Sequence, residues 1–228
     1  MKILGIDTSS NPASVAVTEG DRVIAEAKTV DKSKRSIDIL PLIDTVLTQS
    51  GISLGEVDVY AVAIGPGSFT GLRIGLALCK GFALANKKPV VGVSTLKSIA
   101  RSSGLEGRIA VLMDARRNEV YCGLFEAKNN EINLIGEEKA VLVDEFCAEI
   151  SAETFFIGDG AILHQERLKK RLDKIAQFPS MKDSLSIAGG VAFLAQKELE
   201  NGKGEDYNLI VPRYIRRSEA EMKLERRI

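Results

Sequence analysis

Residues 65–75 read GPGSFTGLRIG, and the interpretation of the whole chain depends on them. They follow a segment typical of a buried strand, 57–67, and begin an expected helix over about 70–86. Glycines stand at positions 65, 67, 71 and 75. A glycine-rich turn before a helix is typical of a phosphate site, because backbone N–H groups there point at an anion. The competing interpretation is a surface that binds another protein.

The expected helix carries small residues along two lines. One ridge consists of Gly71, Gly75, Cys79 and Ala83, which are spaced four apart, and Leu72 and Leu76 flank it. A second ridge consists of Ala77, Gly81 and Ala85. Each interior glycine costs about 1 kcal/mol relative to alanine, so the ridges need a reason. Small residues let another helix approach closely, and a helix that is apolar all round is either central or meets a partner.

The segment 36–50, SIDILPLIDTVLTQS, predicts a second helix with an unusually wide apolar arc. A helix that faces one core needs an apolar stripe of only about 100°. Apolar side chains here cover more than half of the circumference, and those of most interest are Ile37, Leu40, Ile43 and Leu47. The excess suggests a second packing surface.

A weak internal repeat predicts two lobes. The opening ILGID-TSSNPASVAV and the later AVLMD-ARRNEVYCGLF each read as a strand, an aspartate at a bend, and further strand, so that Asp7 corresponds to Asp114. The expected class is an α/β, duplicated two-lobed fold of the actin-like ATPase and sugar-kinase (ASKHA) type, with ATP between the lobes. We expect lobes over 1–103 and 104–205, and a tail over 206–228 that packs back as a helix.

Composition narrows the function. Lysine plus arginine and aspartate plus glutamate number 31 each, and aromatic residues make up 5 %, which disfavours a stand-alone nucleic-acid-binding protein. Three cysteines lie at no motif spacing and predict buried thiols in a reducing compartment. No apolar run has membrane length and no signal peptide is evident, so a soluble, cytoplasmic protein is expected.

Several segments together resemble the bacterial TsaB (YeaZ) family. They are IDTSSNPASVAV, LPLID, GPGSFTGLRIGLALCKGFA, VGVSTL, MDARRNEVYCGLF and the terminal VPRYIRR, and the resemblance spans nearly the whole chain. It implies a non-catalytic subunit that binds the catalytic paralogue TsaD and supports it together with the ATPase TsaE. That machinery attaches a threonylcarbamoyl group to the adenosine beside the anticodon of tRNA.

The same resemblance implies where the partner binds. In TsaB proteins the glycine-rich helix and the helix before it pack with the equivalent pair of TsaD, or with a second copy when TsaD is absent. The expected interface is therefore Ile37, Leu40, Ile43, Leu47, Gly71, Leu72, Gly75, Leu76, Cys79 and Ala83. Contact with tRNA is expected only within the complex, where the basic tail, including Arg216 and Arg217, is a candidate.

The resemblance also implies that the chain is no enzyme. TsaD-like chains carry a metal-binding histidine pair where this sequence has Thr95 and Ile99, and the chain contains a single histidine. No cofactor is expected to be required.

The alternative is an autonomous ATP-dependent phosphotransferase of the same fold class. It would use Asp7, Thr8, Ser9 and Asp114 to hold the nucleotide. The first bend reads Thr8-Ser9-Ser10 and lacks the glycine that lets backbone amides approach a phosphate. We therefore expect a degenerate site with, at most, weak binding of ATP or ADP.

Overall fold

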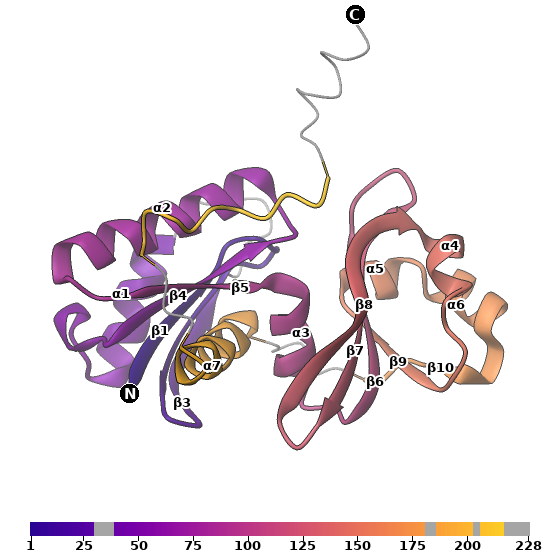
Figure 1. Ribbon diagram of the computed structural model, residues 1–228, viewed down its shortest axis with the longest axis horizontal. Coiled ribbons are helices and arrows are strands. Elements are labelled where there is room, and N and C mark those ends of the chain that lie inside the picture. Colours follow the sequence, from indigo (N-terminus) through magenta and orange to yellow (C-terminus); the bar gives the residue numbers. More distant parts are fainter. Residues whose placement is uncertain (30–38, 181–185, 203–205, 217–228) are drawn as a thin grey trace, which may run out of the picture.

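The computed structural model describes residues 1–29, 39–180, 186–202 and 206–216. The chain forms two lobes, each built on a five-stranded sheet, with helix α3 (Thr95–Ser103) between them (Figure 1). The duplicated two-lobed α/β fold expected from the sequence is confirmed.

The first lobe is a three-layer unit. Its sheet has the order β3-β2-β1-β4-β5, with bounds β1 Lys2–Asp7, β2 Ser14–Glu19, β3 Arg22–Lys28, β4 Val59–Gly65 and β5 Val90–Ser94. Helices α1 (Ile39–Ser50) and α2 (Phe69–Asn86) cover one face, and α7 (Ile187–Glu200) covers the other. The short 3-10 helix η1 (Leu54–Glu56) precedes β4.

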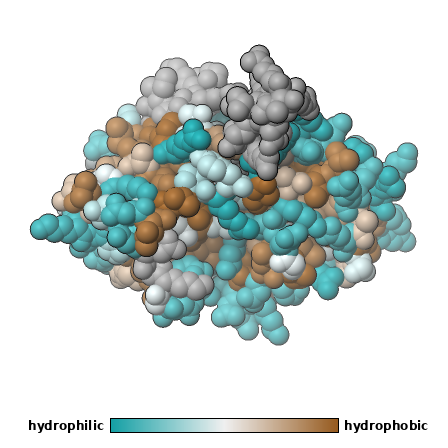
Figure 2. Space-filling model, turned by 45° about the horizontal axis from the view of Figure 1, so that its top comes forward, coloured by the Kyte–Doolittle hydropathy of each residue, from teal (hydrophilic) through white to brown (hydrophobic). Residues whose placement is uncertain are grey.

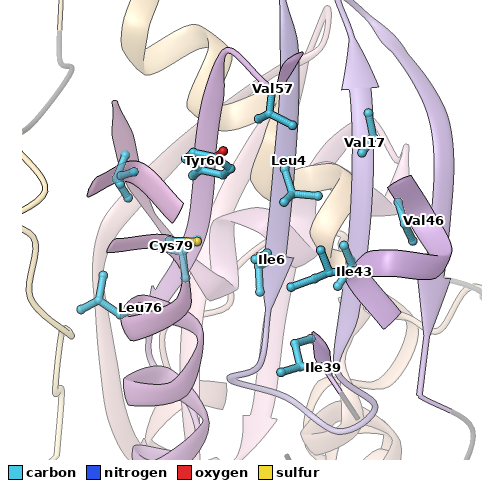
Figure 3. Packing of buried hydrophobic residues seen from close by; sticks show 14 of the residues in the cluster. Leu4, Ile6, Val17, Ile39, Ile43, Val46, Val57, Tyr60, Leu76 and Cys79 are labelled. Atoms are coloured by element: carbon cyan, nitrogen blue, oxygen red, sulfur yellow. The ribbon is translucent and has the colours of Figure 1, made fainter. Parts of the chain in front are cut away.

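Strand alternation produces this layering. In β1, Leu4 and Ile6 point into the core under α1 and α2, whereas Ile3 joins the core under α7. Figure 3 shows the first of these cores, with Ile43 of α1 and Cys79 of α2 both directed at the sheet. Successive strand residues face opposite sides, so one sheet supports helices on both faces.

The second lobe repeats the plan around a sheet of order β10-β9-β6-β7-β8. Its elements are β6 Gly107–Asp114, β7 Glu119–Lys128, β8 Glu131–Leu142, α4 Val143–Cys147, β9 Thr154–Ile157, α5 Asp159–Leu163, α6 Gln165–Leu172, the 3-10 helix η2 Asp173–Ile175 and β10 Ala176–Gln177. β1 pairs antiparallel with β2 and parallel with β4, and β6 pairs in the same way with β7 and β9. The predicted repeat is therefore structural, and Asp7 and Asp114 end equivalent strands.

One lobe boundary and one helix expected from the sequence are wrong. The range 104–205 is not all second lobe, because α7 lies within it and packs on the first sheet, where Val191, Leu194 and Ala195 are buried. The alternating small and apolar residues of α7 give no sign of which sheet it covers. The tail is not helical over residues 206–216, and 217–228 lie outside the described residues.

The ridge Gly71, Gly75, Cys79 and Ala83 faces the chain's own core, which corrects the expectation that it meets a partner. All four residues are buried, as are Leu72 and Leu76. A Cβ atom placed on Gly71 would lie 1.8 Å from the Thr8 carbonyl oxygen, and one on Gly75 would lie 2.4 Å from Thr8 Oγ1. The two glycines therefore make room for the bend after β1.

We expect Gly71→Ala to destabilise the protein by about 2 kcal/mol, because the added methyl group overlaps the Thr8 backbone. Gly81→Ala on the same helix is the matched control. Its Cβ would meet no atom within 4 Å, so this change should stabilise the protein by about 1 kcal/mol through helix propensity. Urea unfolding of both variants measures the difference. Equal effects would contradict the packing described here.

Candidate functional site

The bend after β1 is closed by its own hydroxyl groups. The Asp7 carboxylate is buried, and its Oδ1 accepts hydrogen bonds from Ser9 N at 2.9 Å and from Ser9 Oγ at 2.5 Å. Oδ2 accepts a hydrogen bond from Ser10 Oγ. Thr8 Oγ1 donates to the Gly71 carbonyl oxygen at 2.7 Å. The predicted cofactor residues Asp7, Thr8 and Ser9 thus come together, but they satisfy one another.

The glycine-rich loop lies directly on this bend. Ser68 N donates to the Ser9 carbonyl oxygen at 2.8 Å, and a Cβ atom at Gly67 would lie 2.5 Å from that oxygen. The Ser68 amide, which a phosphate on this loop would need as a hydrogen-bond donor, therefore already has an acceptor within the protein. The glycines of this loop serve close backbone packing, and the phosphate interpretation of GPGSFTG loses its geometric basis.

The second aspartate belongs to a separate network in the other lobe. Asp114 is exposed, and its Oδ1 accepts a hydrogen bond from Arg116 N at 2.8 Å. Its own backbone N–H donates to Asp159 Oδ1 at 3.2 Å, which also accepts from Gly160 N at 2.9 Å. Burial raises the pKa of Asp159, and the charge of Asp114 adds to that rise. Three consecutive residues after Ala115, namely Arg116, Arg117 and Asn118, have positive φ.

The positions compared with the histidine pair are buried at the start of α3. Thr95 and Ile99 stand one helical turn apart, and Thr95 Oγ1 lies 3.1 Å from Ser9 Oγ. Among the described residues, no group of three or more histidine, cysteine, aspartate or glutamate side chains could hold a metal ion.

The face of α1 and α2 that points away from the sheet mixes apolar and polar side chains, with Asp44, Thr48 and Arg73 among its exposed polar residues. Ala77, Gly81 and Ala85 of α2 are exposed, and Leu84 beside them is 63 % exposed. A groove of about 590 Å³ lies between α1 and the segment 51–56; Leu40, Ile43, Leu47, Ile52 and Leu54 are among its lining residues, and Phe82 is the residue that α2 contributes. Figure 2, in which this side of the molecule is turned forward, shows brown apolar areas on the first lobe broken by teal ones. We call this surface the α1/α2 face.

The predicted interface residues divide into three groups. Leu40 is 54 % exposed and Leu47 half-buried, and both line the groove together with the largely buried Ile43. Ile37 lies outside the described residues. The six predicted residues of α2 lie on its buried side.

The prediction from the sequence selects a ridge of α2 that is buried, although a signal for the exposed ridge is present. Arg73 and Lys80 are the only charged residues of the helix, and they lie on the same side as Ala77, Gly81 and Leu84. Charged side chains mark the side that faces solvent, so they distinguish the two ridges.

The basic tail is engaged within the chain as far as the structure describes it. Arg216 Nη1 donates to the Ala115 carbonyl oxygen at 2.9 Å and lies 2.8 Å from Glu119 Oε2. Arg217 and the residues after it lie outside the described residues. Arg216 is therefore a poor candidate for contact with tRNA, because its guanidinium already has two partners.

Comparison with solved structures identifies the class of fold. The ROK hexokinase from Thermus thermophilus superposes with a TM-score of 0.52 at 10 % identity, covering 87 % of this chain and all of that one. The fold is thus that of the actin-like ATPases and sugar kinases. YeaZ from Pseudomonas aeruginosa is more similar, with a TM-score of 0.79 at 29 % identity over 93 % of this chain and 99 % of that one.

Comparison with sequences identifies the family. The family model described as TsaD, tRNA N6-adenosine threonylcarbamoyltransferase, matches residues 25–224. The TsaB proteins of Bacillus subtilis and Escherichia coli, both named for tRNA threonylcarbamoyladenosine biosynthesis, are 31 % and 36 % identical to this chain. The alignments cover 98 % and 70 % of this chain, and 97 % and 72 % of those proteins. The chain belongs to the TsaB (YeaZ) family, as its motifs predicted.

Helices long and apolar enough to span a membrane do not occur in the part of the chain that the structure describes. The three cysteines are buried and unpaired, as expected from their sequence context.

The Asp7 network makes a prediction about pH. Burial raises the pKa of Asp7 above its usual value of 3.8, and hydrogen bonds from Ser10 and Ser9 only partly oppose this. The folded state then holds this proton more tightly than the unfolded state. The stability that Asp7 contributes is full below the usual pKa and is lost as pH rises through the raised pKa.

Asp7→Asn removes this titration. The free energy of unfolding of the variant, relative to the wild type, should therefore increase between about pH 4 and about pH 7. Urea unfolding at a series of pH values measures this difference in the free energy of unfolding. The contributions of the other buried carboxylates cancel in the difference, because both proteins contain them. A relative stability that falls with rising pH would show that the pKa of Asp7 is lowered instead.

Proposed function

We propose that this chain is a non-catalytic subunit in the formation of N6-threonylcarbamoyladenosine in tRNA. It binds the catalytic paralogue TsaD through the α1/α2 face and supports its turnover together with TsaE. The names of its relatives in Bacillus subtilis and Escherichia coli support the pathway. Any contact of the tail with tRNA involves residues beyond 216 and occurs only within the complex.

The observation that carries the partner assignment is the outward ridge of α2. Ala77, Gly81 and Ala85 are small and exposed, and a Cβ atom on Gly81 would meet nothing within 4 Å. An exposed glycine inside a helix lowers stability by about 1 kcal/mol relative to alanine, and Gly81 makes no contact within this fold that requires a glycine. Close approach of a second helix supplies the reason. The groove beside α1 opens on the same side of the lobe as this ridge, and the two together suit a partner that presents a helix pair.

The same face suits a second copy of this chain when TsaD is absent. A homodimer would place two α1/α2 faces together around a twofold axis, since a twofold contact uses the same patch on both subunits. TsaD and a second copy therefore compete for one surface.

A non-catalytic role fits the chemistry of the buried groups. Burial raises the pKa of the Cys79, Cys122 and Cys147 thiols, that of Cys122 to about 12, so none is an activated nucleophile. The Asp7 bend is filled by its own hydroxyl groups. No cofactor is required for the role proposed here.

The alternative, an autonomous ATP-dependent phosphotransferase, is favoured only by the fold class. We expect the purified chain alone to show no ATP hydrolysis above background and to bind ATP or ADP weakly, because the Ser68 amide is bonded to the Ser9 carbonyl oxygen and the hydroxyl groups of Ser9 and Ser10 are bonded to Asp7. Isothermal titration and a phosphate-release assay measure both. Tight binding with turnover would replace the proposed function by the alternative.

The partner surface is tested by Gly81→Leu with Gly81→Ala as the matched control. A leucine side chain at position 81 would point into solvent and not into the core, so the variant should fold. Circular dichroism checks this. It should weaken binding to TsaD from the same organism by about 10- to 100-fold, because the close helix approach becomes overpacked. Alanine, which adds one methyl group, should weaken binding much less.

Binding is measured by titration of labelled protein, and by co-purification. If both variants bind TsaD as the wild type does, the outward ridge of α2 does not form the contact. The same two variants should change formation of modified tRNA by TsaD and TsaE, supplied with an activated threonylcarbamoyl donor, in the order wild type, alanine, leucine.

A further inference from the structure

The segment Tyr207–Arg216, which we call the strap, crosses from the first lobe to the second. In Figure 1 it is the yellow stretch that runs along α2 before it turns towards the other lobe. Ile210 anchors it in the core of the first lobe and is 2 % exposed. Arg213 N donates to the Ile64 carbonyl oxygen at 2.7 Å, at the end of β4. The first half of the strap is therefore fixed to the first lobe.

The second half of the strap is bound to the second lobe by charge. Arg213 Nη1 lies 2.7 Å from Glu138 Oε2 of β8, and the Glu138 side chain is only 2 % exposed. The other oxygen of this carboxylate accepts a hydrogen bond from Ser94 Oγ, at the first turn of α3. One buried carboxylate of the second lobe thus holds two groups of the first.

A second arginine repeats the arrangement three residues later. Arg216 reaches the Ala115 carbonyl oxygen and the Glu119 carboxylate, on the turn between β6 and β7. Ile215, between the arginines, packs in the core shared by α3 and the second sheet. This turn also carries Asp114, so the strap holds the second of the two equivalent aspartate bends.

The strap also contacts the helix of the α1/α2 face. The Tyr214 ring stacks on Phe69 with centroids 4.6 Å apart, and its hydroxyl accepts a hydrogen bond from Arg73 Nε at 2.9 Å. Within ten residues, the strap therefore touches α2, the end of β4 and two elements of the second lobe.

We propose that the strap is an intramolecular clasp that fixes the spacing of the two lobes, with Arg213 and Arg216 as its two points of attachment to the second lobe. In the actin-like class a nucleotide lies between the lobes, whereas here the chain's own C-terminal segment joins them. The clasp would hold the lobes together without any ligand. This inference does not depend on the proposed function.

The attachment points are strong because they are partly withdrawn from water. The Arg216 side chain is 19 % exposed and its carboxylate partner 34 %, while Glu138 is nearly inaccessible. The Arg213–Glu138 contact is a charge-assisted hydrogen bond, and breaking it leaves the buried Glu138 carboxylate without its cationic partner, whereas Arg216 forms an ion pair with Glu119.

The test measures the distance between the lobes. Spin labels are placed on Gln49→Cys in α1 and Lys170→Cys in α6, both exposed positions, and double electron–electron resonance reports their separation. The three native cysteines are buried, so the label goes to the introduced thiols. With the clasp intact, the distribution of distances should be narrow.

Arg213→Gln combined with Arg216→Gln should broaden that distribution and move its maximum to longer distances. The matched control is Arg167→Gln, which breaks an ion pair with Asp144 at 2.7 Å inside the second lobe and should leave the distribution unchanged. Circular dichroism establishes that each variant is folded. Should the double variant fail to fold, Glu138→Gln opens the same contact from the other side with little change in size.

A distance distribution identical to that of the wild type, in either folded clasp variant, would overturn the proposal. The proposal would also fail if the Arg167→Gln control broadened the distribution as much as the clasp variants do, because the effect would then reflect general loss of charge pairing.

Discussion

The contact between the bend after β1 and two glycines of α2 sets the orientation of the surfaces on the first lobe. Thr8 inserts its backbone oxygen against Gly71 and its hydroxyl against Gly75, at distances that no side chain would allow. This contact fixes the rotation of α2 about its own axis. One ridge of small residues is thereby buried, and the other, with Gly81, is presented to solvent. The proposed partner surface exists because the first ridge is used internally.

The same contact removes the phosphate site that the fold class would suggest. Once the glycine-rich loop lies on Ser9, its amide donates to the Ser9 carbonyl oxygen, and the hydroxyl groups of the bend bind the Asp7 carboxylate. The glycines of this loop allow the close approach of the chain to itself, since a Cβ atom at Gly67 would lie 2.5 Å from the Ser9 carbonyl oxygen.

The two lobes are joined by more than the chain connection between them. Helix α3 belongs to both, because Leu96 and Ile99 pack on the second sheet while the helix lies beside α7 of the first lobe. The chain returns to the first lobe at α7 and reaches the second lobe again through the strap, which adds two further connections. The relation of the lobes is thus set by buried apolar packing at α3 and by paired charges at the strap.

The sequence by itself determined the class of fold, the repeat of the opening strands in the two lobes, and the family, because these depend on local periodicity and on motifs such as GPGSFTG and DARRNEVY. It also indicated that α2 carries more small residues than its own fold needs. Only the tertiary structure decided which ridge of α2 is outward, that α7 covers the first sheet, and that Arg213 and Arg216 reach the second lobe. Each of these depends on contacts between residues far apart in the chain, and a helical period gives the spacing of a face but not its direction.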